Sequence, residues 1–247
     1  MDRQKILILG GTGEGIALAT ALITLADCHV ISSLAGRVAN PKMPAGEVRI
    51  GGFGGADGLA AYLEKNSIAA VIDATHPFAY RMGWNAARAA ERASVKLLRF
   101  ERPAWIAQPA DRWIEIDDWN GAVDVLRSSA ERVFLALGRQ ELEPFTALKD
   151  IAFVIRSVEP LDPALIFANA EILLARGPFR LDDERALLQS RAIDHVVCKN
   201  SGGDATDAKL LAARALGITV IMQRRPVRPD VPKVSDIDAA IAWVTSL

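Results

Sequence analysis

The sequence predicts an α/β fold made of two parallel-sheet domains with a cleft between them. Short apolar runs alternate along the chain with segments of helical periodicity, the pattern of repeated strand–helix–strand crossovers. The early runs are continuously apolar, as expected for strands buried on both faces of a sheet. The alternation breaks near residue 102 and then resumes, which indicates two halves.

In the first half, residues 6–9 form the first apolar run, and apolar side chains then recur at helical spacing over residues 16–23. The other strands are expected at residues 29–33, 48–50, 70–73 and 96–100. The other helices are expected at residues 59–63 and 78–93.

In the second half, three tryptophans lie in a stretch that we expect to be irregular: Trp105, Trp113 and Trp119. Strands are then expected at residues 133–137, 153–158, 172–175, 195–198 and 220–222. Helices are expected at residues 182–192, 205–216 and 237–244. The predicted domains are residues 1–101 and 102–247, with a soft boundary, because a strand near the junction could pair with the sheet of the other half.

Composition excludes several classes of protein. The 247 residues carry a net charge of -1, so neither nucleic acid nor a membrane is an expected partner. Cys28 and Cys198 lie in apolar runs and predict buried thiols rather than a disulfide framework. No apolar run reaches the ~18 residues of a membrane-spanning helix, and residues 1–5 lack the pattern of a signal peptide. We expect a cytoplasmic protein, and no metal-binding motif is present.

A glycine-rich turn links the first strand to the first helix, the place of the phosphate-binding turn in a Rossmann-like domain. Glycine backbone can approach an anion closely there, and the helix N-terminus adds partial positive charge. The match to G-x-G-x-x-G is partial, because the third position is Ile16 and Gly15 stands one residue early. A tight turn without a ligand is the alternative. The residues expected to hold a dinucleotide pyrophosphate are Gly10, Gly11, Thr12, Gly13, Glu14 and Gly15.

The end of the second strand indicates which dinucleotide is bound. Sites for NAD place an acidic residue ~20 residues after the first glycine, but no acid lies between Asp27 and Glu47. Ser33 can instead donate to a 2′-phosphate, and Arg37 offers a planar fork suited to one. NADPH is therefore the expected cofactor, although an arginine in a loop can also be plain surface.

The turn after the strand at residues 70–73 should border the nicotinamide, because ligands of open α/β sheets lie beyond the carboxyl ends of strands. Pro77 suits the first turn of a helix, with Thr75 or His76 as its cap. His76 is assigned to the cofactor side, and its role in catalysis stays open.

Two turns of the second half are candidate anion sites. Lys199, Asn200, Ser201, Gly202 and Gly203 follow the strand at residues 195–198 and precede the expected helix, so they repeat the arrangement of the first turn. Arg139 follows another strand end and is expected to face the same cleft. Such local clusters could hold a substrate rich in carboxylates.

Together these segments make the chain similar to the precorrin-6A reductase family of cobalamin (vitamin B12) biosynthesis. The resemblance covers nearly the whole chain. It rests on residues 10–15 (Gly-Gly-Thr-Gly-Glu-Gly), 73–79 (Asp-Ala-Thr-His-Pro-Phe-Ala), 138–139 (Gly-Arg) and 199–203 (Lys-Asn-Ser-Gly-Gly), and on residues 209–214 leading to Arg225 and Pro226. The order of these motifs is more specific than the first glycine turn alone.

The resemblance implies an NADPH-dependent oxidoreductase that reduces one double bond of a tetrapyrrole, converting precorrin-6A to precorrin-6B. It also implies that residues 10–15 hold the pyrophosphate, that Ser33 and Arg37 hold the adenosine phosphate, and that residues 199–203 meet the substrate's carboxylates. The cofactor supplies the hydride, so the chain must align it and provide a proton. The proton donor stays open among Lys199, His76, Tyr80 and water. Neighbouring enzymes of the pathway are candidate partners.

Three alternatives stand beside this interpretation. The related anaerobic route uses a cobalt-containing substrate, which the sequence does not distinguish. A short-chain dehydrogenase would need a Tyr-x-x-x-Lys pair, but Tyr62 is followed by Asn66 and Tyr80 by Trp84. A regulator that senses NADP without chemistry would not need the turn at Lys199.

Overall fold

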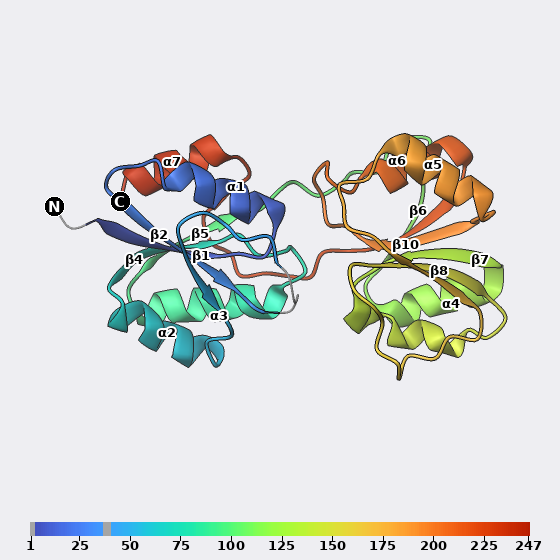
Figure 1. Cartoon of the computed structure of the whole chain (residues 1–247), viewed down its shortest axis with the longest axis horizontal. Coiled ribbons are helices and arrows are strands. Elements are labelled where there is room, and N and C mark those ends of the chain that lie inside the picture. The colour runs from blue at the N-terminus through green and yellow to red at the C-terminus, as the bar shows by residue number, and fades with distance from the viewer. Residues whose placement is uncertain (1–2, 37–40) are drawn as a thin grey trace. The chain divides into compact units, whose positions relative to one another are not determined.

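The computed structural model describes residues 3–36 and 41–247. The chain divides into two compact units, Met1–Pro103 with Pro226–Leu247, and Ala104–Arg225. Each unit contains a six-stranded sheet in which neighbouring strands run parallel (Figure 1). The expected pair of parallel-sheet α/β domains is confirmed.

The first unit has the strand order β12-β5-β4-β1-β2-β3, so its order reverses between β1 and β4 as in dinucleotide-binding sheets. Its elements are β1 (Gln4–Leu9), α1 (Gly13–Leu22), β2 (Cys28–Leu34), β3 (Glu47–Ile50), α2 (Gly55–Lys65), β4 (Ile68–Asp73), α3 (Tyr80–Arg92), β5 (Lys96–Phe100), β12 (Lys233–Val234) and α7 (Ile237–Thr245).

Alternation along β1 explains how helices cover both faces of this sheet. Ile6 and Ile8 join the buried cluster that includes side chains of α1 and α7, whereas Leu7 and Leu9 join the cluster formed with α2 and α3. Figure 1 shows these two helix pairs on opposite faces of the sheet. The continuous apolar run of the first strand thus reflects burial on both sides.

The second unit repeats this plan with the strand order β6-β11-β10-β7-β8-β9, which reverses between β7 and β10. Its strands and α-helices are β6 (Arg112–Ile116), α4 (Trp119–Ser129), β7 (Arg132–Ala136), β8 (Ala152–Ser157), β9 (Ala170–Leu174), α5 (Leu181–Ser190), β10 (His195–Lys199), α6 (Ala208–Leu216) and β11 (Thr219–Gln223). Two short 3₁₀ turns, η1 (Arg139–Glu141) and η2 (Glu143–Ala147), follow β7.

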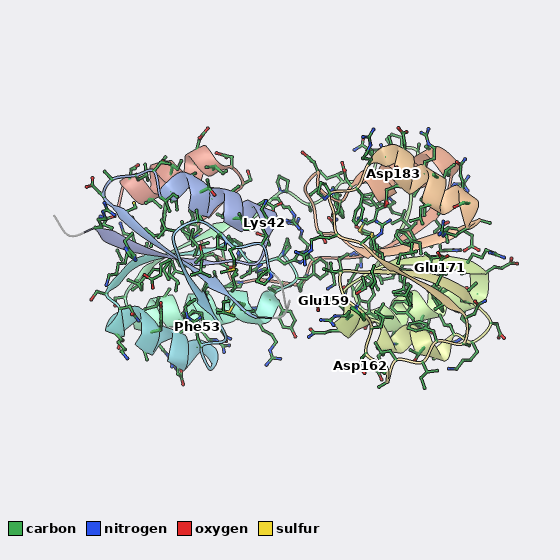
Figure 2. The ribbon with its side chains drawn as sticks, in the orientation of Figure 1. Lys42, Phe53, Glu159, Asp162, Glu171 and Asp183 are labelled. Atoms are coloured by element: carbon green, nitrogen blue, oxygen red, sulfur yellow. The ribbon has the colours of Figure 1, made fainter. Side chains whose placement is uncertain are left out.

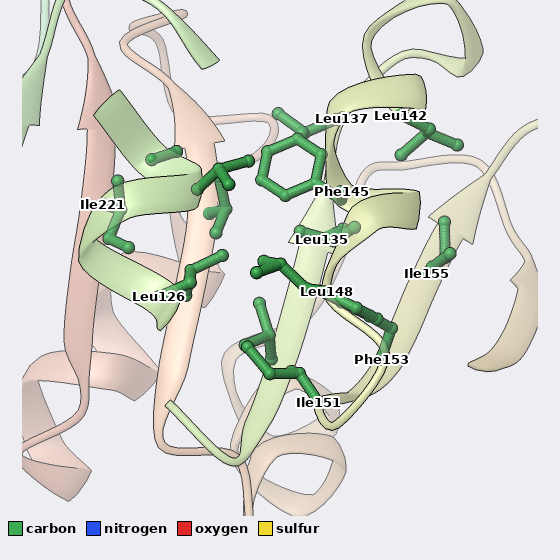
Figure 3. Packing of buried hydrophobic residues seen from close by; sticks show 14 of the residues in the cluster. Leu126, Leu135, Leu137, Leu142, Phe145, Leu148, Ile151, Phe153, Ile155 and Ile221 are labelled. Atoms are coloured by element: carbon green, nitrogen blue, oxygen red, sulfur yellow. The ribbon is translucent and has the colours of Figure 1, made fainter. Parts of the chain in front are cut away.

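One face of the second sheet is covered by α4 and η2, which bring Leu126, Phe145 and Leu148 against Leu135 of β7 (Figure 3). The other face packs on α5 and α6, and there Phe134 of β7 joins a second cluster. Neighbouring residues of β7 therefore bury opposite faces, which accounts for its unbroken apolar sequence.

The first sheet receives its sixth strand, β12, from the C-terminal segment, whereas all six strands of the second sheet come from the continuous stretch Ala104–Arg225. β12 pairs with β5 through Lys233 with Arg99 and Val234 with Phe100. The expectation that residues 226–247 belong to the second domain is wrong, because α7 buries Ala240 and Val244 in the core of the first unit. The expected irregular stretch also contains β6 and the start of α4, so only Trp105 of its three tryptophans lies outside regular structure.

In the part of the chain that the structure describes, no helix has the length and apolar character to cross a membrane. The same residues contain no group of three or more His, Cys, Asp or Glu side chains placed to hold a metal ion.

Candidate active site

The glycine turn after β1 is anchored to the turn after β4. Thr12 is the N-cap of α1: its Oγ1 accepts a hydrogen bond from the Gly15 amide at 3.0 Å and donates to the Ala74 carbonyl at 2.9 Å. A Cβ at Gly15 would lie 3.3 Å from Thr12 Oγ1 and 3.4 Å from the Ala74 Cβ, so the start of α1 lies close to the turn after β4. The two segments meet where the strand order reverses, which is where such sheets bind ligands.

Other glycines of this turn leave their backbone open. Gly11 has φ +110°, a conformation that favours glycine, and a Cβ at Gly11 or Gly13 would meet nothing within 4 Å. These positions can therefore receive a phosphate group close to the backbone. Glu14, also expected on the cofactor, forms an ion pair with Arg102 at 2.7 Å. That pairing offsets the negative charge of Glu14 beside an expected anion.

The turn after β4 is organised by a buried carboxylate. Asp73 Oδ1 accepts hydrogen bonds from the Thr75 amide at 3.1 Å and the Thr75 hydroxyl at 2.6 Å. Its Oδ2 accepts from Arg228, which reaches the turn from the C-terminal segment. Arg228 Nη1 also donates to the His76 carbonyl at 3.3 Å. The sequence offered no signal for Arg228 here, because 155 residues separate it from Asp73.

The expected capping role of Thr75 and His76 is wrong. Helix α3 begins at Tyr80 with Ala79 as its N-cap, and Pro77 precedes the helix. The reason is that residues 76–79 form a turn of their own before the helix. The His76 carbonyl accepts a hydrogen bond from the Ala79 amide at 2.7 Å, and the His76 ring Nδ1 accepts one from the Phe78 amide at 3.2 Å. With Nδ1 as an acceptor, the proton of a neutral His76 ring is on Nε2.

Ser33 lies at the end of β2, buried, and its hydroxyl accepts a hydrogen bond from Arg49 at 2.7 Å. Arg37, the cation expected beside it, lies outside the described residues. Arg49 is not among the residues expected from the sequence. The available signal was its place at the end of the next strand, since Ser33 and Arg49 are register partners in the β2–β3 ladder.

In the second unit, the two expected anion-binding turns contact each other. Lys199 ends β10, and its Nζ forms an ion pair with Glu141 of η1, just after β7. Arg139 forms an ion pair with Glu159 at 2.6 Å, and Figure 2 labels Glu159 in this unit. Both expected substrate cations therefore have carboxylate partners within the chain.

The Asn200 side chain binds the backbone of Trp105. Its Oδ1 accepts from the Trp105 amide at 2.8 Å, and its Nδ2 donates to the Trp105 carbonyl at 3.0 Å. The Trp105 indole donates to the Gly203 carbonyl at 3.0 Å, and Arg225 donates to the carbonyls of Asn200 and Ser201. The loop that follows Lys199 is thus held by Trp105, near the start of the second unit, and by Arg225, at its end.

The expected helix start at residue 205, directly after the glycines, is wrong. Gly202 and Gly203 have φ +69° and +74°, and α6 begins only at Ala208. Lys209, in the first turn of α6, donates to the Thr206 carbonyl and lies 4.7 Å from the Trp105 ring centroid. Burial lowers the pKa of Lys209 below the usual lysine value. Residues 204–207 therefore separate the two glycines from the N-terminus of α6.

Comparisons with known proteins agree with this architecture over nearly the whole chain. Residues 5–245 match the family model described as "Precorrin-6x reductase CbiJ/CobK". A protein of Rhodococcus erythropolis named "Precorrin-6A reductase" is 49% identical over 244 residues, covering 98% of both chains. A protein of Priestia megaterium named "Cobalt-precorrin-6A reductase" is 28% identical and covers 90% of both.

A solved structure titled "CobK precorrin-6A reductase" matches with a TM-score of 0.91 and 40% identity, over 98% of this chain and 96% of that one.

Proposed function

The chain belongs to the precorrin-6x reductase family, and we propose that it reduces precorrin-6A to precorrin-6B in cobalamin biosynthesis with NADPH as the reductant. The observation that carries the assignment is the 49% identity to a precorrin-6A reductase over almost the full length of both chains. The resemblance identified from the glycine turns and the Lys199 loop leads to the same family.

The cofactor would be held by the first unit. Open backbone at Gly11 and Gly13, beside the switch between β1 and β4, fits a pyrophosphate, and Gly10 and Thr12 complete that turn. Thr75 and His76 lie in the turn after the neighbouring strand, β4, and would border the nicotinamide. When bound, NADPH supplies a hydride. The chain's own part is to hold the acceptor carbon in line and to deliver a proton to the adjacent carbon.

The substrate would be held by the second unit. Lys199 and Arg139 lie at the switch between β7 and β10, the corresponding edge of the second sheet. Ser201, Gly202 and Gly203 form the neighbouring loop, whose shape is maintained by Asn200. Carboxylates of a tetrapyrrole would compete with Glu141 and Glu159 for the two cations, because oppositely charged partners can exchange at a partly exposed site.

The proton donor stays unassigned among groups that fit the chemistry. A neutral His76 carries its proton on Nε2, because Nδ1 is engaged by the Phe78 amide. Tyr80 begins α3 and is 48% exposed, so its hydroxyl can reach a ligand. Lys199 and bound water are the other candidates.

The second candidate function is reduction of the cobalt-containing substrate. Relatives named for that reaction are 28% identical, against 42–49% for those named for precorrin-6A, which favours the metal-free substrate. A regulator that senses NADP without chemistry is disfavoured by membership of a reductase family.

The test is an anaerobic assay of the purified protein with each substrate and each nicotinamide cofactor, followed by the loss of reduced-nicotinamide absorbance. We expect the highest kcat/KM with precorrin-6A and NADPH. A higher kcat/KM with cobalt-precorrin-6A would move the protein to the related route. Binding of NADPH without its oxidation would support the sensing alternative and overturn the proposal.

A further inference from the structure

We propose that Arg49 reads the 2′-phosphate of NADPH and makes the site selective for the phosphorylated cofactor. The inference rests on the proposed cofactor and adds a specificity-determining residue to it. Arg49 stands near the carboxyl end of β3, next to Ser33 at the end of β2. In a dinucleotide-binding sheet, the end of the second strand is where the adenosine ribose lies.

The guanidinium of Arg49 is held in one position by the chain. Its Nη1 donates to the Ser33 hydroxyl at 2.7 Å and the Gly51 carbonyl at 3.0 Å, and its Nη2 donates to the Gly52 carbonyl at 3.1 Å. It also lies over the Phe53 ring, 3.8 Å from its centroid (Phe53 is labelled in Figure 2). A side chain fixed in this way loses little conformational freedom when it binds an anion.

The charge of Arg49 is not offset by a carboxylate among the residues that the structure describes. Its three acceptors there are a hydroxyl and two carbonyls, all neutral. The other partly buried arginines of this unit differ, since Arg102 pairs with Glu14, and Arg228 pairs with Asp73. Glu47, two residues before Arg49, pairs with His29 at 2.8 Å. Among the described residues at this edge of the first sheet, Arg49 is therefore a positive charge that is held in place and not paired with a carboxylate.

The loop after β3 leaves room beside this charge. Its sequence is Gly-Gly-Phe-Gly-Gly, residues 51–55, and a Cβ at any of the four glycines would meet nothing within 4 Å. Three of them have positive φ, between +82° and +120°. The positive φ accounts for glycine at three of these positions, and the open space beside all four lets a ligand approach the backbone closely. A 2′-phosphate would accept from Arg49 and from the Ser33 hydroxyl, which can donate while it accepts from Arg49.

The competing explanation is that Arg49 only ties the glycine loop to β2. Arg49→Gln separates the two roles, because the amide can still donate to Ser33 or to one carbonyl but carries no charge. Dissociation constants for NADPH and for NADH are measured by nicotinamide fluorescence for the wild type and the variant. We expect NADPH binding to weaken about ten- to 150-fold, the range for loss of a charge-assisted hydrogen bond, with NADH binding nearly unchanged.

Three further variants complete the test. Arg88→Gln removes one exposed positive charge from α3 of the same unit and should leave both constants unchanged. Arg49→Lys keeps the charge and should retain part of the preference for NADPH. Arg37→Ala is measured in parallel, because Arg37 was the cation expected from the sequence.

Equal weakening of NADPH and NADH by Arg49→Gln would show a structural role and overturn the inference. Loss of the preference in Arg37→Ala, with the preference intact in Arg49→Gln, would also overturn it. In both cases the proposed function would stand. A wild-type protein that binds neither dinucleotide would instead overturn the proposed cofactor.

Discussion

The positively charged side chains proposed to bind ligands in the two units differ in whether a carboxylate pairs with them. Lys199 and Arg139 already have carboxylate partners, Glu141 and Glu159, whereas Arg49 is held by neutral acceptors in the described residues. A substrate carboxylate that meets Lys199 must therefore displace a partner of like charge. The free energy gained on binding is the difference between the ion pair with the substrate and the ion pair with Glu141. Substrate affinity should therefore depend on Glu141 as well as on Lys199.

Replacing Lys199 with Met is expected to raise the KM for precorrin-6A by about tenfold or more, since a charge-assisted contact is lost. The dissociation constant for NADPH should stay unchanged, because the cofactor is assigned to the other unit. Glu141→Gln is the matched variant: it removes the competing carboxylate and should leave the KM equal or lower. Steady-state kinetics and cofactor titrations measure both. Reduced NADPH affinity in Lys199→Met would mean that the two turns were assigned to the wrong ligands.

Sequence patterns predicted the glycine-rich turns better than the long-range partners of their side chains. Glycines after an apolar run identify a turn, so residues 10–15 and 199–203 could be found from local spacing. The partners of Asp73 and Lys199 lie 155 and 58 residues away, and only the folded sheet brings them together. Local spacing likewise does not indicate that Asn200 binds the backbone of Trp105, 95 residues away.

At the scale of elements, the regularity of the apolar pattern explains why the buried strands could be predicted. Buried strands such as β1 and β7 have unbroken apolar runs and were expected within two residues of their observed ends. β6, at the edge of its sheet, reads Arg-Trp-Ile-Glu-Ile, which is neither an unbroken apolar run nor a strict alternation of polar and apolar residues, and only Ile116 of its five residues is buried. A short, half-exposed strand of this kind carries too weak a pattern to be recognised.

Helix α3 depends on a glycine that makes room for a buried ion pair. A Cβ at Gly83 would lie 2.5 Å from Arg228 Nη2, and the Arg228 and Asp73 side chains are only 6% and 2% exposed. Gly83→Ala should therefore displace the guanidinium and lower the free energy of unfolding by about 3–5 kcal/mol. The higher helix propensity of alanine should restore about 1 kcal/mol of this loss. Urea denaturation of the variant measures the net loss.

Gly121 is the matched control, because it also lies in the first turns of a helix, α4, and a Cβ there would lie 3.5 Å from its nearest neighbour. Gly121→Ala should be neutral or stabilising by up to about 1 kcal/mol. A loss in Gly83→Ala no larger than in this control would show that Arg228 adapts without cost.

The contact between β6 and α6 predicts a dependence of stability on pH. Asp111, just before β6, pairs with Arg214 of α6 at 2.8 Å. Burial raises the pKa of Asp111, but the hydrogen bonds from Arg214 and the Gln108 amide outweigh it and hold the pKa below its usual value. An unfolded chain has an Asp pKa of about 3.9, so the unfolded state binds the proton more readily.

The stability from Asp111 is therefore fully present above about pH 5 and is lost as pH falls below 3.9 through the folded-state pKa. Asp111→Asn should be less stable than the wild type at neutral pH, with the difference shrinking towards pH 3. Denaturant midpoints across this range measure it. A difference that stays constant with pH would show that the charge of Asp111 does not contribute.

At the scale of the whole chain, the first sheet takes its sixth strand, β12, from the C-terminal segment that follows the second unit. The prediction of two parallel-sheet domains needed only the alternating pattern. The assignment of residues 226–247 failed, because β12 is two residues long and its pairing with β5 is a long-range event. Sequence order placed this segment with its neighbour, whereas burial of α7 on α1 places it with the first unit.

The central claim is that this chain transfers a hydride from NADPH to precorrin-6A. The most direct measurement is a single turnover with NADPH deuterated at both C4 positions of the nicotinamide, followed by mass spectrometry of the tetrapyrrole. We predict a product with one deuterium from the cofactor and one hydrogen from solvent, formed in amounts equal to the NADPH oxidised. An unlabelled reduced product, or unchanged precorrin-6A beside bound NADPH, would contradict the claim.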